Sequence, residues 1–351
     1  MIAGAGGAPS EGVIHSLLRN SEFEIFGMGS DITDLVSSRA PIKKLVPYAT
    51  EVEYEKSLIS ILDDVKPDFI HFQNDLEIYE ASKIRNIFDE RGIKYFMPNH
   101  DVIDTCVHKY KSYLAFSSAG IRVPRNLLIS TESDLTTSFL ELGDENGKIW
   151  LRSSAIGGGG KGSLSTSNLD FAKAWITANN GWGTFLAAQM LTKDTVTWQS
   201  IWHQGELVVA QTRKRSGWVH GNRSISGITG VTKIGTTMSD EMVDQIAIES
   251  VYAVDKAPHG IYGVDMAYDK HGIPNPTEIN IARFFTTIRF FTDCGLNMPE
   301  IYVQLGLGLK VRDIPQKLNP LPNNLSWLRG MDREPILISG EDLKSFEAEV
   351  K

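Results

Sequence analysis

Apolar and polar residues alternate in two different rhythms over the first hundred positions. One rhythm follows the i, i+3, i+4, i+7 spacing of an amphipathic helix, at Leu58, Ile61, Leu62 and Val65. Pro67 should end this helix, because proline lacks an amide donor. The other rhythm is a set of short apolar runs typical of buried strands, at 1–3, 24–27, 69–72 and 93–97. Helices are predicted between them, at 12–19 and around 84–88. This alternation predicts an α/β unit with a parallel, doubly wound sheet that ends near residue 100.

The pattern changes after residue 109, where most of the predicted elements are strands. Helices are predicted at 110–119 and 240–254, and strands at 148–153, 185–191, 196–202, 207–211, 263–268 and 277–281. A Gln204-Gly205 turn should join two of these strands. Pro274 and Pro276 remove ladder donors, so the last strand should lie at a sheet edge or begin only at Thr277. The sequence from Pro315 is rich in Pro and Asn, which favours a covering tail.

The composition is that of an ordinary globular protein. The chain has 351 residues, of which 42% are hydrophobic and 22% charged. This length favours two or three domains or subdomains. The sequence has 35 Lys and Arg against 43 Asp and Glu, a net charge of −8. An acidic balance argues against nucleic acid or an anionic membrane as the main partner. No apolar stretch approaches the roughly 20 residues that span a bilayer.

The cysteines and the first residues of the sequence indicate the cellular compartment. The two cysteines, Cys106 and Cys294, have no metal-like spacing. They exclude a disulfide scaffold and fit a reducing environment. No basic residue precedes Arg19, so we expect no ordinary secretory signal. These features predict a cytoplasmic protein.

The glycines near the N-terminus are the first candidate binding motif. Gly4 and Gly6 stand where a dinucleotide fingerprint, GxGxxG, would begin, but Pro9 occupies its third glycine position. Asp31 is a poor match for the acidic residue that binds ribose in that motif. The favoured interpretation is a tight turn that packs the helix on the sheet, which counts against a dinucleotide-dependent oxidoreductase.

A second glycine-rich segment follows the strand predicted at 148–153, in which Arg152 lies. Residues 157–162 read Gly-Gly-Gly-Gly-Lys-Gly. The P-loop pattern fails at both ends, because Ala155 stands at its first glycine and Gly162 at its Ser/Thr. Glycines allow a backbone to approach phosphates closely and to present N–H groups to them. The segment therefore predicts a lid over phosphates, and the alternative is a mobile hairpin tip.

Three oxygen-bearing side chains near the last strands form the third candidate. Glu278 and Asn280 are two residues apart and share a strand face, and Asp265 lies on the preceding strand across a short turn. Two carboxylates and an amide oxygen form a hard oxygen site suited to Mg²⁺. The alternative is a solvated strand face. The metal site is favoured because the neighbouring residues are apolar, as a buried opposite face requires: Met266, Ile279 and Ile281.

In this order the motifs resemble the ATP-grasp superfamily, in particular the carboxylate–amine ligases related to the large subunit of carbamoyl phosphate synthetase. Four strings within residues 1 to about 312 carry the resemblance: MIAGAGGAPSEGVIHSLL, HKYKSYLAFSSAGIRVP, IWLRSSAIGGGGKGS and GVDMAYDKHGIPNPTEINIARFFTT. The resemblance implies an α/β and α+β chain, an ATP-grasp fold with an N-terminal parallel doubly wound (pre-ATP-grasp) domain. That domain is expected at 1–105, a lid subdomain with the glycine-rich loop at 106–191, a catalytic subdomain with the metal site at 192–312, and a covering tail at 313–351.

The resemblance also implies roles for single residues. Asp265, Glu278 and Asn280 match the metal-binding set. Nucleotide-binding positions are expected at Lys109, Arg152, Gly158, Gly159, Gly160, Lys161, Ala188, Gln189, Leu191 and Asp194. Cations for the acyl phosphate or the substrate are expected at Arg213, Arg215 and Arg283. By themselves, Lys109 and the Arg213-Lys214-Arg215 run are more typical of a solvated surface. The chain departs from the pattern at His108, which replaces an acid, and at Ser153-Ser154, where relatives often have proline followed by a basic or polar residue.

The reaction implied by the resemblance is ATP-dependent ligation. ATP with Mg²⁺ or Mn²⁺ would activate a small carboxylate as an acyl phosphate, and an amine would then displace phosphate to form an amide. One alternative is a kinase that phosphorylates a carboxylate or carbamate without ligation. Another is a nucleotide-binding protein without turnover. Homodimers are frequent among similar proteins, and neither a nucleic acid nor a membrane partner is expected.

Overall fold

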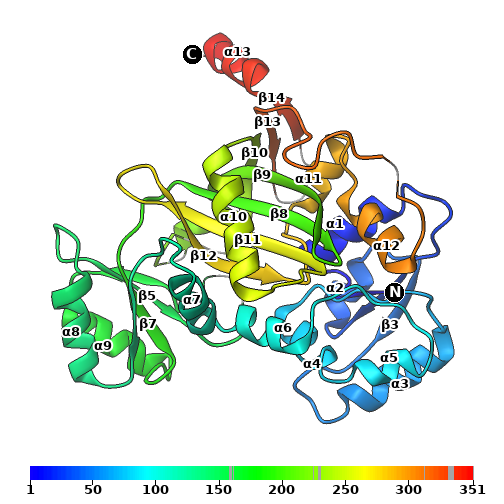
Figure 1. The fold of residues 1–351 in the computed structure, drawn as a ribbon, viewed down its shortest axis with the longest axis horizontal. Coiled ribbons are helices and arrows are strands. Elements are labelled where there is room, and N and C mark those ends of the chain that lie inside the picture. Colours follow the sequence, from blue (N-terminus) through cyan, green and yellow to red (C-terminus); the bar gives the residue numbers. More distant parts are fainter. Residues whose placement is uncertain are drawn as a thin grey trace.

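The computed structural model of the chain describes residues 1–157, 160, 162–223, 225–227, 231–311, 313–330 and 336–350. These residues form three sheets with helices packed around them (Figure 1). The sheets follow one another along the chain, except that the largest also takes strands from the C-terminal segment. None of the described helices combines the length and the apolar character needed to cross a membrane.

The N-terminal sheet is parallel, as predicted, with the strand order β1 (Ile2–Ala3), β2 (Phe26–Gly29) and β3 (Ile42–Leu45). Single parallel bridges join Ile2 to His71 and Phe69 to Lys94. The runs at 69–72 and 93–97 therefore continue the parallel arrangement without forming full strands. The sequence pattern missed β3, whose end residues Ile42 and Leu45 are exposed and flank two lysines. Helices of this unit are α1 (Ala8–Leu17), α2 (Ile32–Ser37), α3 (Tyr54–Val65), α4 (Asp75–Ala81), α5 (Arg85–Asp89) and α6 (His100–Val107).

The second sheet is antiparallel, in the order β4 (Asn126–Ile129), β7 (Phe185–Ala188), β5 (Ile149–Ser153) and β6 (Leu164–Thr166). Helix α7 (Lys109–Ser118) leads into it, and Gly120 follows that helix with a φ of 75°. Helices α8 (Glu132–Leu142) and α9 (Leu169–Ala178) pack on the sheet through a small apolar core that includes Leu135, Leu151, Ile176 and Phe185.

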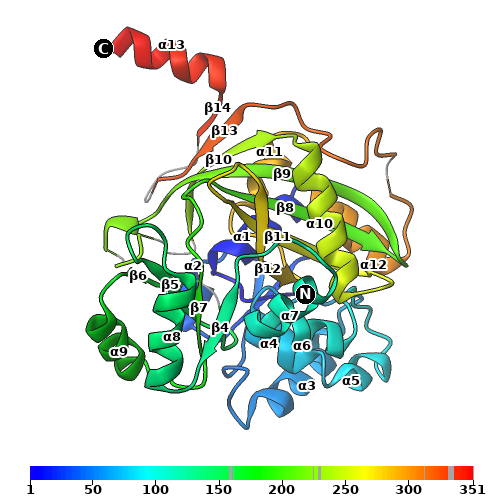
Figure 2. The same ribbon diagram turned by 60° about the vertical axis from the view of Figure 1, so that its left-hand side comes forward.

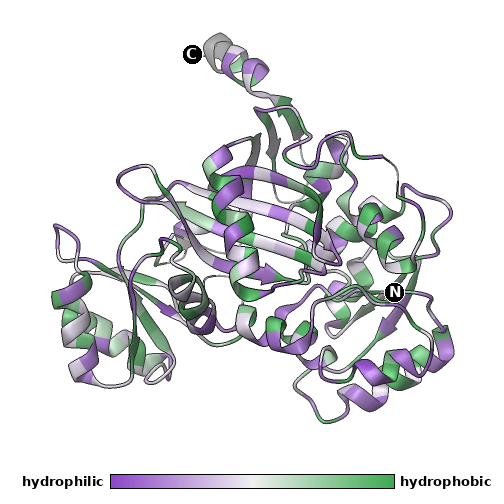
Figure 3. Ribbon diagram, viewed as in Figure 1, coloured by the Kyte–Doolittle hydropathy of each residue, from purple (hydrophilic) through white to green (hydrophobic). Residues whose placement is uncertain are grey.

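The third sheet has the strand order β12-β11-β8-β9-β10-β13-β14. Its strands are β8 (Thr195–His203), β9 (Glu206–Trp218), β10 (Thr232–Met238), β11 (Gly260–Tyr268), β12 (Pro274–Ile281), β13 (Leu325–Leu328) and β14 (Ile336–Ser339). Helix α10 (Glu241–Val254) has Asp240, the first residue of the predicted helix, as its N-cap, and it packs on one face of the sheet through buried Val243, Ala247 and Val251. Figure 3 shows green and purple residues interleaved along α10, as expected of a helix with one buried face.

The opposite face of this sheet meets the N-terminal unit. Helices α11 (Ile288–Asp293) and α12 (Met298–Leu307) lie between them and share one apolar core with α1, including Ile14, Phe290 and Tyr302. The face of the sheet that meets the N-terminal unit carries the polar residues that the sequence singled out, because the strands alternate apolar and polar positions. A short 3₁₀ helix, η1 (Gly221–Arg223), follows β9.

Two sequence predictions about strand ends are resolved by the topology. β12 begins at Pro274 and lies at the edge of the sheet, where the missing proline donors face no neighbouring strand. The Gln204-Gly205 turn joins β8 to β9 with φ values of 51° and 88°, and His203 pairs with Glu206 across it. This is the left-handed geometry that a two-residue hairpin requires.

The segment after Pro315 does more than cover the molecule. It runs along β9, where Leu318 bridges to Ala210, and then adds β13 and β14 to the sheet edge beyond β10. Helix α13 (Gly340–Val350) follows β14 and projects from the body of the molecule (Figures 1 and 2). The sequence pattern did not predict these strands, because each is only four residues long.

Candidate active site

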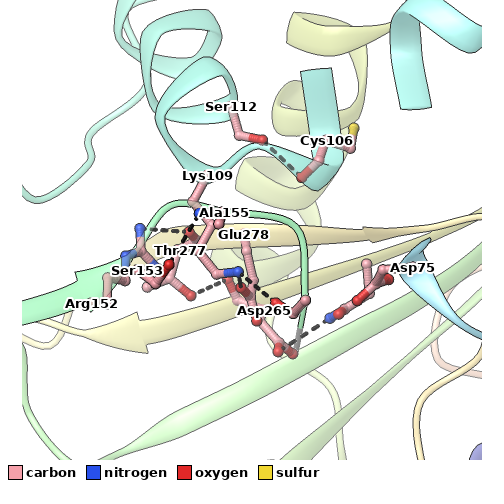
Figure 4. A network of polar contacts seen from close by, with 12 residues as sticks. Asp75, Cys106, Lys109, Ser112, Arg152, Ser153, Ala155, Asp265, Thr277 and Glu278 are labelled. Atoms are coloured by element: carbon pink, nitrogen blue, oxygen red, sulfur yellow. Dashed lines mark hydrogen bonds and ion pairs between the residues drawn. The ribbon is translucent and has the colours of Figure 1, made fainter. Parts of the chain in front are cut away.

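The three predicted metal ligands lie side by side on the polar face of the largest sheet. Asp265 of β11 stands directly opposite Glu278 of β12, and Asn280 follows two residues later on the same face. Asn280 Nδ2 donates to Asp265 Oδ2 at 3.2 Å, and the Thr197 hydroxyl donates to Asp265 Oδ1 at 2.6 Å. Strand pairing therefore brings together three side chains that the sequence separates by a turn, and Figure 4 shows two of them, Asp265 and Glu278.

Cations from four different elements surround this oxygen cluster. Lys109 Nζ, at the start of α7, lies 3.4 Å from Glu278 Oε2. Arg215 Nη1, on β9, lies 3.1 Å from Asp265 Oδ2. Arg283, just after β12, donates to Asn280 Oδ1 and pairs with Asp75, with 3.0 Å between Nη2 and Oδ2. Arg152 of β5 donates from Nη2 to the Thr277 carbonyl at 3.2 Å. The second sheet and the N-terminal unit thus both reach the metal-ligand candidates.

The cations decide the charge of Glu278. Burial raises the pKa of this carboxyl, but Lys109, Arg152, Arg283 and Arg215 outweigh burial and hold the pKa at about 2. Burial lowers the pKa of Arg152, and the attraction of Glu278 offsets only part of that effect. Burial also disfavours the charge of Arg283, but its ion pair with Asp75 raises the pKa above the ordinary value. The cluster therefore carries a carboxylate and opposing cations at neutral pH.

A small pocket of about 20 Å³ opens among these groups. It is lined by Asp75, Lys109, Gly157, Glu278, Asn280 and Arg283, together with Cys106, Val107 and Ile279. Lys109 Nζ also donates to the Gly157 carbonyl at 3.1 Å. The start of the glycine-rich segment is therefore tied to the same lysine that faces Glu278.

The donor set fits Mg²⁺. Carboxylate and amide oxygens are hard ligands, and Mg²⁺ in proteins takes one or two carboxylates and completes its coordination with phosphate and water. Among the described residues no group of three or more His, Cys, Asp or Glu side chains could hold a metal ion. The site would consequently depend on Asn280 as a third protein donor beside Asp265 and Glu278.

Comparisons with known proteins identify the fold of the chain. No protein-family model matches the chain, and no curated protein matches it in sequence. Among solved structures, carboxyaminoimidazole ribonucleotide synthase from Aspergillus clavatus, complexed with ATP, has a TM-score of 0.71 at 16% identity, over 93% of this chain and 80% of that one. The ADP complex of N5-carboxyaminoimidazole synthetase from Staphylococcus aureus has a TM-score of 0.71 at 14% identity, over 99% and 84%.

L-amino acid ligase from Bacillus licheniformis also matches, with a TM-score of 0.67 at 10% identity, over 93% of this chain and 77% of that one. The chain has the ATP-grasp fold. Identities of 10% to 16% establish the ATP-grasp architecture and no residue roles. The predicted fold is therefore confirmed, and the predicted site residues stay predictions.

Within the ATP-grasp fold, the predicted nucleotide-binding residues Ala188, Gln189 and Leu191, which the resemblance implies form a hinge, lie where the second sheet leads to the largest one. Ala188 ends β7 and pairs with both Asn126 and Trp150. The Gln189 amide donates to the Arg125 carbonyl at 3.1 Å, so this N–H already has a partner. Leu191 is half-buried in the following link. This link gives the hinge residues a position between the two sheets.

Asp194 lies away from the oxygen cluster. Its exposed carboxylate pairs with Lys214 Nζ at 3.1 Å, on the α10 side of β9, and its carbonyl accepts from the Tyr268 amide at 3.0 Å. No described contact joins it to Lys109 or Glu278. Its predicted contact with the nucleotide, which the resemblance implies is with the ribose, therefore has the weakest geometric support in the set.

Part of the predicted lid lies outside the described residues, namely Gly158, Gly159 and Lys161. Gly160 is described, has a φ of 68° and accepts from the Ser163 amide at 3.0 Å. The Gly162 carbonyl accepts from Trp175 Nε1 at 2.9 Å. The C-terminal end of the loop is thus fixed to α9, as its N-terminal end is to Lys109.

Arg213 occupies a different place from the other predicted cations. Its side chain is 2% exposed, lies over the Phe285 ring at 3.8 Å from the centroid, and donates to the Thr287 hydroxyl. Burial and the neighbouring Arg215 lower its pKa to about 9. The solvated-surface alternative is wrong for Arg213, because its side chain is buried. The alternation of residues along a strand does not distinguish a buried arginine from an exposed one.

Two site residues were missed by sequence reasoning. Asp75 pairs with Arg283 across 208 positions, and Thr197 donates to Asp265 across 68. A signal existed for Asp75, since it follows the apolar run at 69–72, and ligands of parallel sheets gather at the carboxyl ends of strands. No local pattern marks Thr197.

Proposed function

We propose that the chain is an ATP-dependent ligase that activates a small carboxylate as an acyl phosphate and joins it to an amine, with release of ADP and phosphate. The observation that carries this proposal is the cluster of Asp265, Glu278 and Asn280 faced by Lys109, Arg152, Arg215 and Arg283. A hard oxygen site beside several cations suits the phosphates of a nucleotide. The solved ATP-grasp structures that it resembles include complexes with ATP and ADP and ligases by name.

Phosphoryl transfer needs positioning and charge neutralisation more than covalent help. Lys109 and Arg152 reach the site from the second sheet and its leading helix, where they would bind nucleotide phosphates. Asp265, Glu278 and Asn280 would hold Mg²⁺, or Mn²⁺, which shares the preference for oxygen ligands. When bound, such an ion supplies electrostatic stabilisation of the phosphates.

The reaction balances with the groups proposed. A carboxylate oxygen attacks the γ-phosphorus of ATP and ADP leaves, which gives an acyl phosphate. The amine nitrogen then attacks the carbonyl carbon, phosphate leaves, and the nitrogen loses a proton to give the amide. Arg283 is held by Asp75 beside Asn280, where its charge would offset the phosphoryl oxygens. The loop that begins at Gly157 would exclude water, which otherwise hydrolyses the intermediate.

The first experiment measures ADP release from Mg-ATP across a panel of small carboxylates, with hydroxylamine present. Hydroxylamine traps an acyl phosphate as a hydroxamate. Carboxylate-dependent ADP together with hydroxamate is the expected result. ADP without hydroxamate would contradict acyl-phosphate chemistry, and ADP release from no carboxylate would contradict the ligase.

A pair of matched variants tests the assigned metal ligand. Glu278→Gln removes one charge from the cluster, and we expect at least a hundredfold loss of kcat, because the site would hold the ion that stabilises the phosphates less tightly. Glu249→Gln makes the same change on the exposed face of α10, where Glu249 accepts from Gln245 at 2.9 Å, and should act like the wild type. A Glu278→Gln protein that turns over normally would rule out the role of Glu278.

A further inference from the structure

A second group of cations lies on the polar face of the largest sheet, one strand beyond Thr197, which pairs with Arg213. Arg213 shares this face with Arg215, because the two are two residues apart on β9. Arg329 follows β13 and shares the face as well, since Trp327 pairs with Gly235, which itself pairs with Arg215. β13 belongs to the C-terminal segment that the sequence analysis assigned to a covering tail.

Arg213 and Arg329 converge on one short stretch of chain. Arg213 donates from Nη1 to the Thr287 hydroxyl, and Arg329 Nη1 lies 3.4 Å from the Thr286 carbonyl. Their charges act on each other, since Arg329 is among the groups that lower the pKa of Arg213, after burial and Arg215. Two guanidinium groups thus approach two adjacent threonines, one each, from different strands.

Among the described residues no carboxylate forms an ion pair with either guanidinium group, and only the more distant charge of Asp265 raises the pKa of Arg213. In the part of the chain that the structure describes, neither Arg213 nor Arg329 forms an ion pair, whereas Arg215 pairs with Asp265. Arg213 Nε, in a side chain that is 2% exposed, has no hydrogen-bond partner among the described residues. Gln199 Nε2, on the neighbouring strand β8, is likewise buried without a partner, while its Oε1 accepts from the Phe285 amide at 3.2 Å.

Buried donors without partners are costly, and a buried charge is costlier still unless an opposite charge meets it. An anion at this place would pair with both arginines and satisfy the free donors. It would not be the transferred phosphoryl group, whose neighbours would be the cations around Glu278: Lys109, Arg152, Arg283 and Arg215. Arg213 and Arg329 are not among those four.

We propose that Arg213 and Arg329 bind a second anionic group of the substrate. This inference rests on the proposed function, and it narrows the substrate to a small carboxylate that carries a further carboxylate or phosphate-type group. Arg213 and Arg215 are about 7 Å apart along the strand, at roughly 3.4 Å per residue. A substrate that meets both arginines would carry its two anionic groups only a few atoms apart.

Matched probes test the second group. Succinate and 3-phosphonopropionate each carry one carboxylate and a second anion at similar length, and butyrate lacks the second anion. We expect kcat/KM for ADP release to favour one of the two dianions over butyrate by at least tenfold. The dianion that is favoured tells whether the second group is a carboxylate or a phosphate type. Equal use of butyrate and both dianions would overturn the proposal.

Arg329→Met should erase this preference, mainly through a higher KM for the dianion, while butyrate is used as before. Arg329→Lys should restore part of it. Arg91→Met is the matched control, because it also removes one half-buried arginine, which lies in the N-terminal unit and pairs with Asp63 at 2.7 Å. A loss of equal size for butyrate and the dianion in Arg329→Met would show a structural role and contradict the proposal.

Binding without turnover separates this proposal from the ligase. Calorimetric titration of the full chain in the presence of Mg-ADP gives the affinities of succinate, 3-phosphonopropionate and butyrate directly. If no carboxylate releases ADP but a dianion binds, and binding weakens at least tenfold in Arg329→Met, the ligase fails and the anion subsite stands. If neither dianion binds more tightly than butyrate, the subsite is refuted whatever the turnover.

Discussion

Glu77 places a carboxyl group in the interior of the N-terminal unit. It is 8% exposed, and its Oε1 accepts from the Tyr54 hydroxyl at 2.9 Å. Burial raises its pKa from 4.5 to about 7, although the hydrogen bond from Tyr54 acts in the opposite direction. Near neutral pH the folded chain therefore holds a group that binds a proton more tightly than the unfolded chain does.

The raised pKa of Glu77 determines how the stability of the folded chain changes with pH. The stability contributed by this group is fully present below about pH 4.5, and it is lost as pH rises through about 7. Glu77→Gln keeps an oxygen for Tyr54 and removes the titration. We expect this variant to exceed the wild type in unfolding free energy at pH 8 by roughly 1–3 kcal/mol, and by much less at pH 5. Denaturant unfolding at both pH values measures it, and a difference independent of pH would contradict the assignment.

The turn between β1 and α1 shows how backbone geometry fixes an element. Gly6 has a φ of 92°, and a Cβ there would lie 2.0 Å from the Asp34 carbonyl oxygen of α2. Gly92, past α5, has a φ of 67° but nothing within 4 Å of such a Cβ. Both substitutions strain the backbone, and only the first also forces α2 away from β1.

Gly6→Ala should accordingly destabilise the chain by several kcal/mol more than Gly92→Ala, which should cost about 1 kcal/mol. Chemical denaturation of the two variants measures the difference. Equal losses would mean that the left-handed conformation alone, and not the approach of α2, requires the glycine. This outcome would also weaken the interpretation of the glycines as a tight packing turn.

At the scale of elements, sequence patterns succeeded where burial is one-sided and continuous. The apolar spacing of 58–65 became α3, and the prolines before Thr277 placed β12 at an edge. Patterns failed for β3, β13 and β14, which have four residues each. Such short strands depend on neighbours supplied by the fold, so their own residues carry too little periodicity to be found.

At the scale of the whole molecule, the oxygen cluster was predictable and its surroundings only partly so. Asp265, Glu278 and Asn280 follow from alternation along two adjacent strands. Asp75 and Thr197 reach the cluster through tertiary packing across 208 and 68 positions. The same packing brings Arg329 of the C-terminal segment toward Arg213. A linear pattern holds no information about such distances, which is why Arg329 could not be predicted as a neighbour of Arg213.

The proposed nucleotide site joins the second sheet to the largest one, so occupancy should stabilise the whole molecule. A ligand that binds only the folded chain raises the unfolding free energy by mass action, about 2.7 kcal/mol at a hundredfold excess over Kd. We expect Mg-ATP to raise the melting temperature and NAD to leave it unchanged, because Lys109 and Arg152 face Glu278 whereas Pro9 interrupts the dinucleotide pattern.

Lys109→Met should remove most of the Mg-ATP effect, since Lys109 contacts both Glu278 and the Gly157 carbonyl. Lys66→Met, which changes an exposed lysine past α3, is the control and should keep the effect. Thermal unfolding followed by circular dichroism, with and without Mg-ATP, makes the comparison. If NAD raises the melting temperature as much as Mg-ATP does, the nucleotide binds at the N-terminal unit instead. This result would refute the ligase proposal, because no nucleotide phosphate would then lie beside the cations around Glu278.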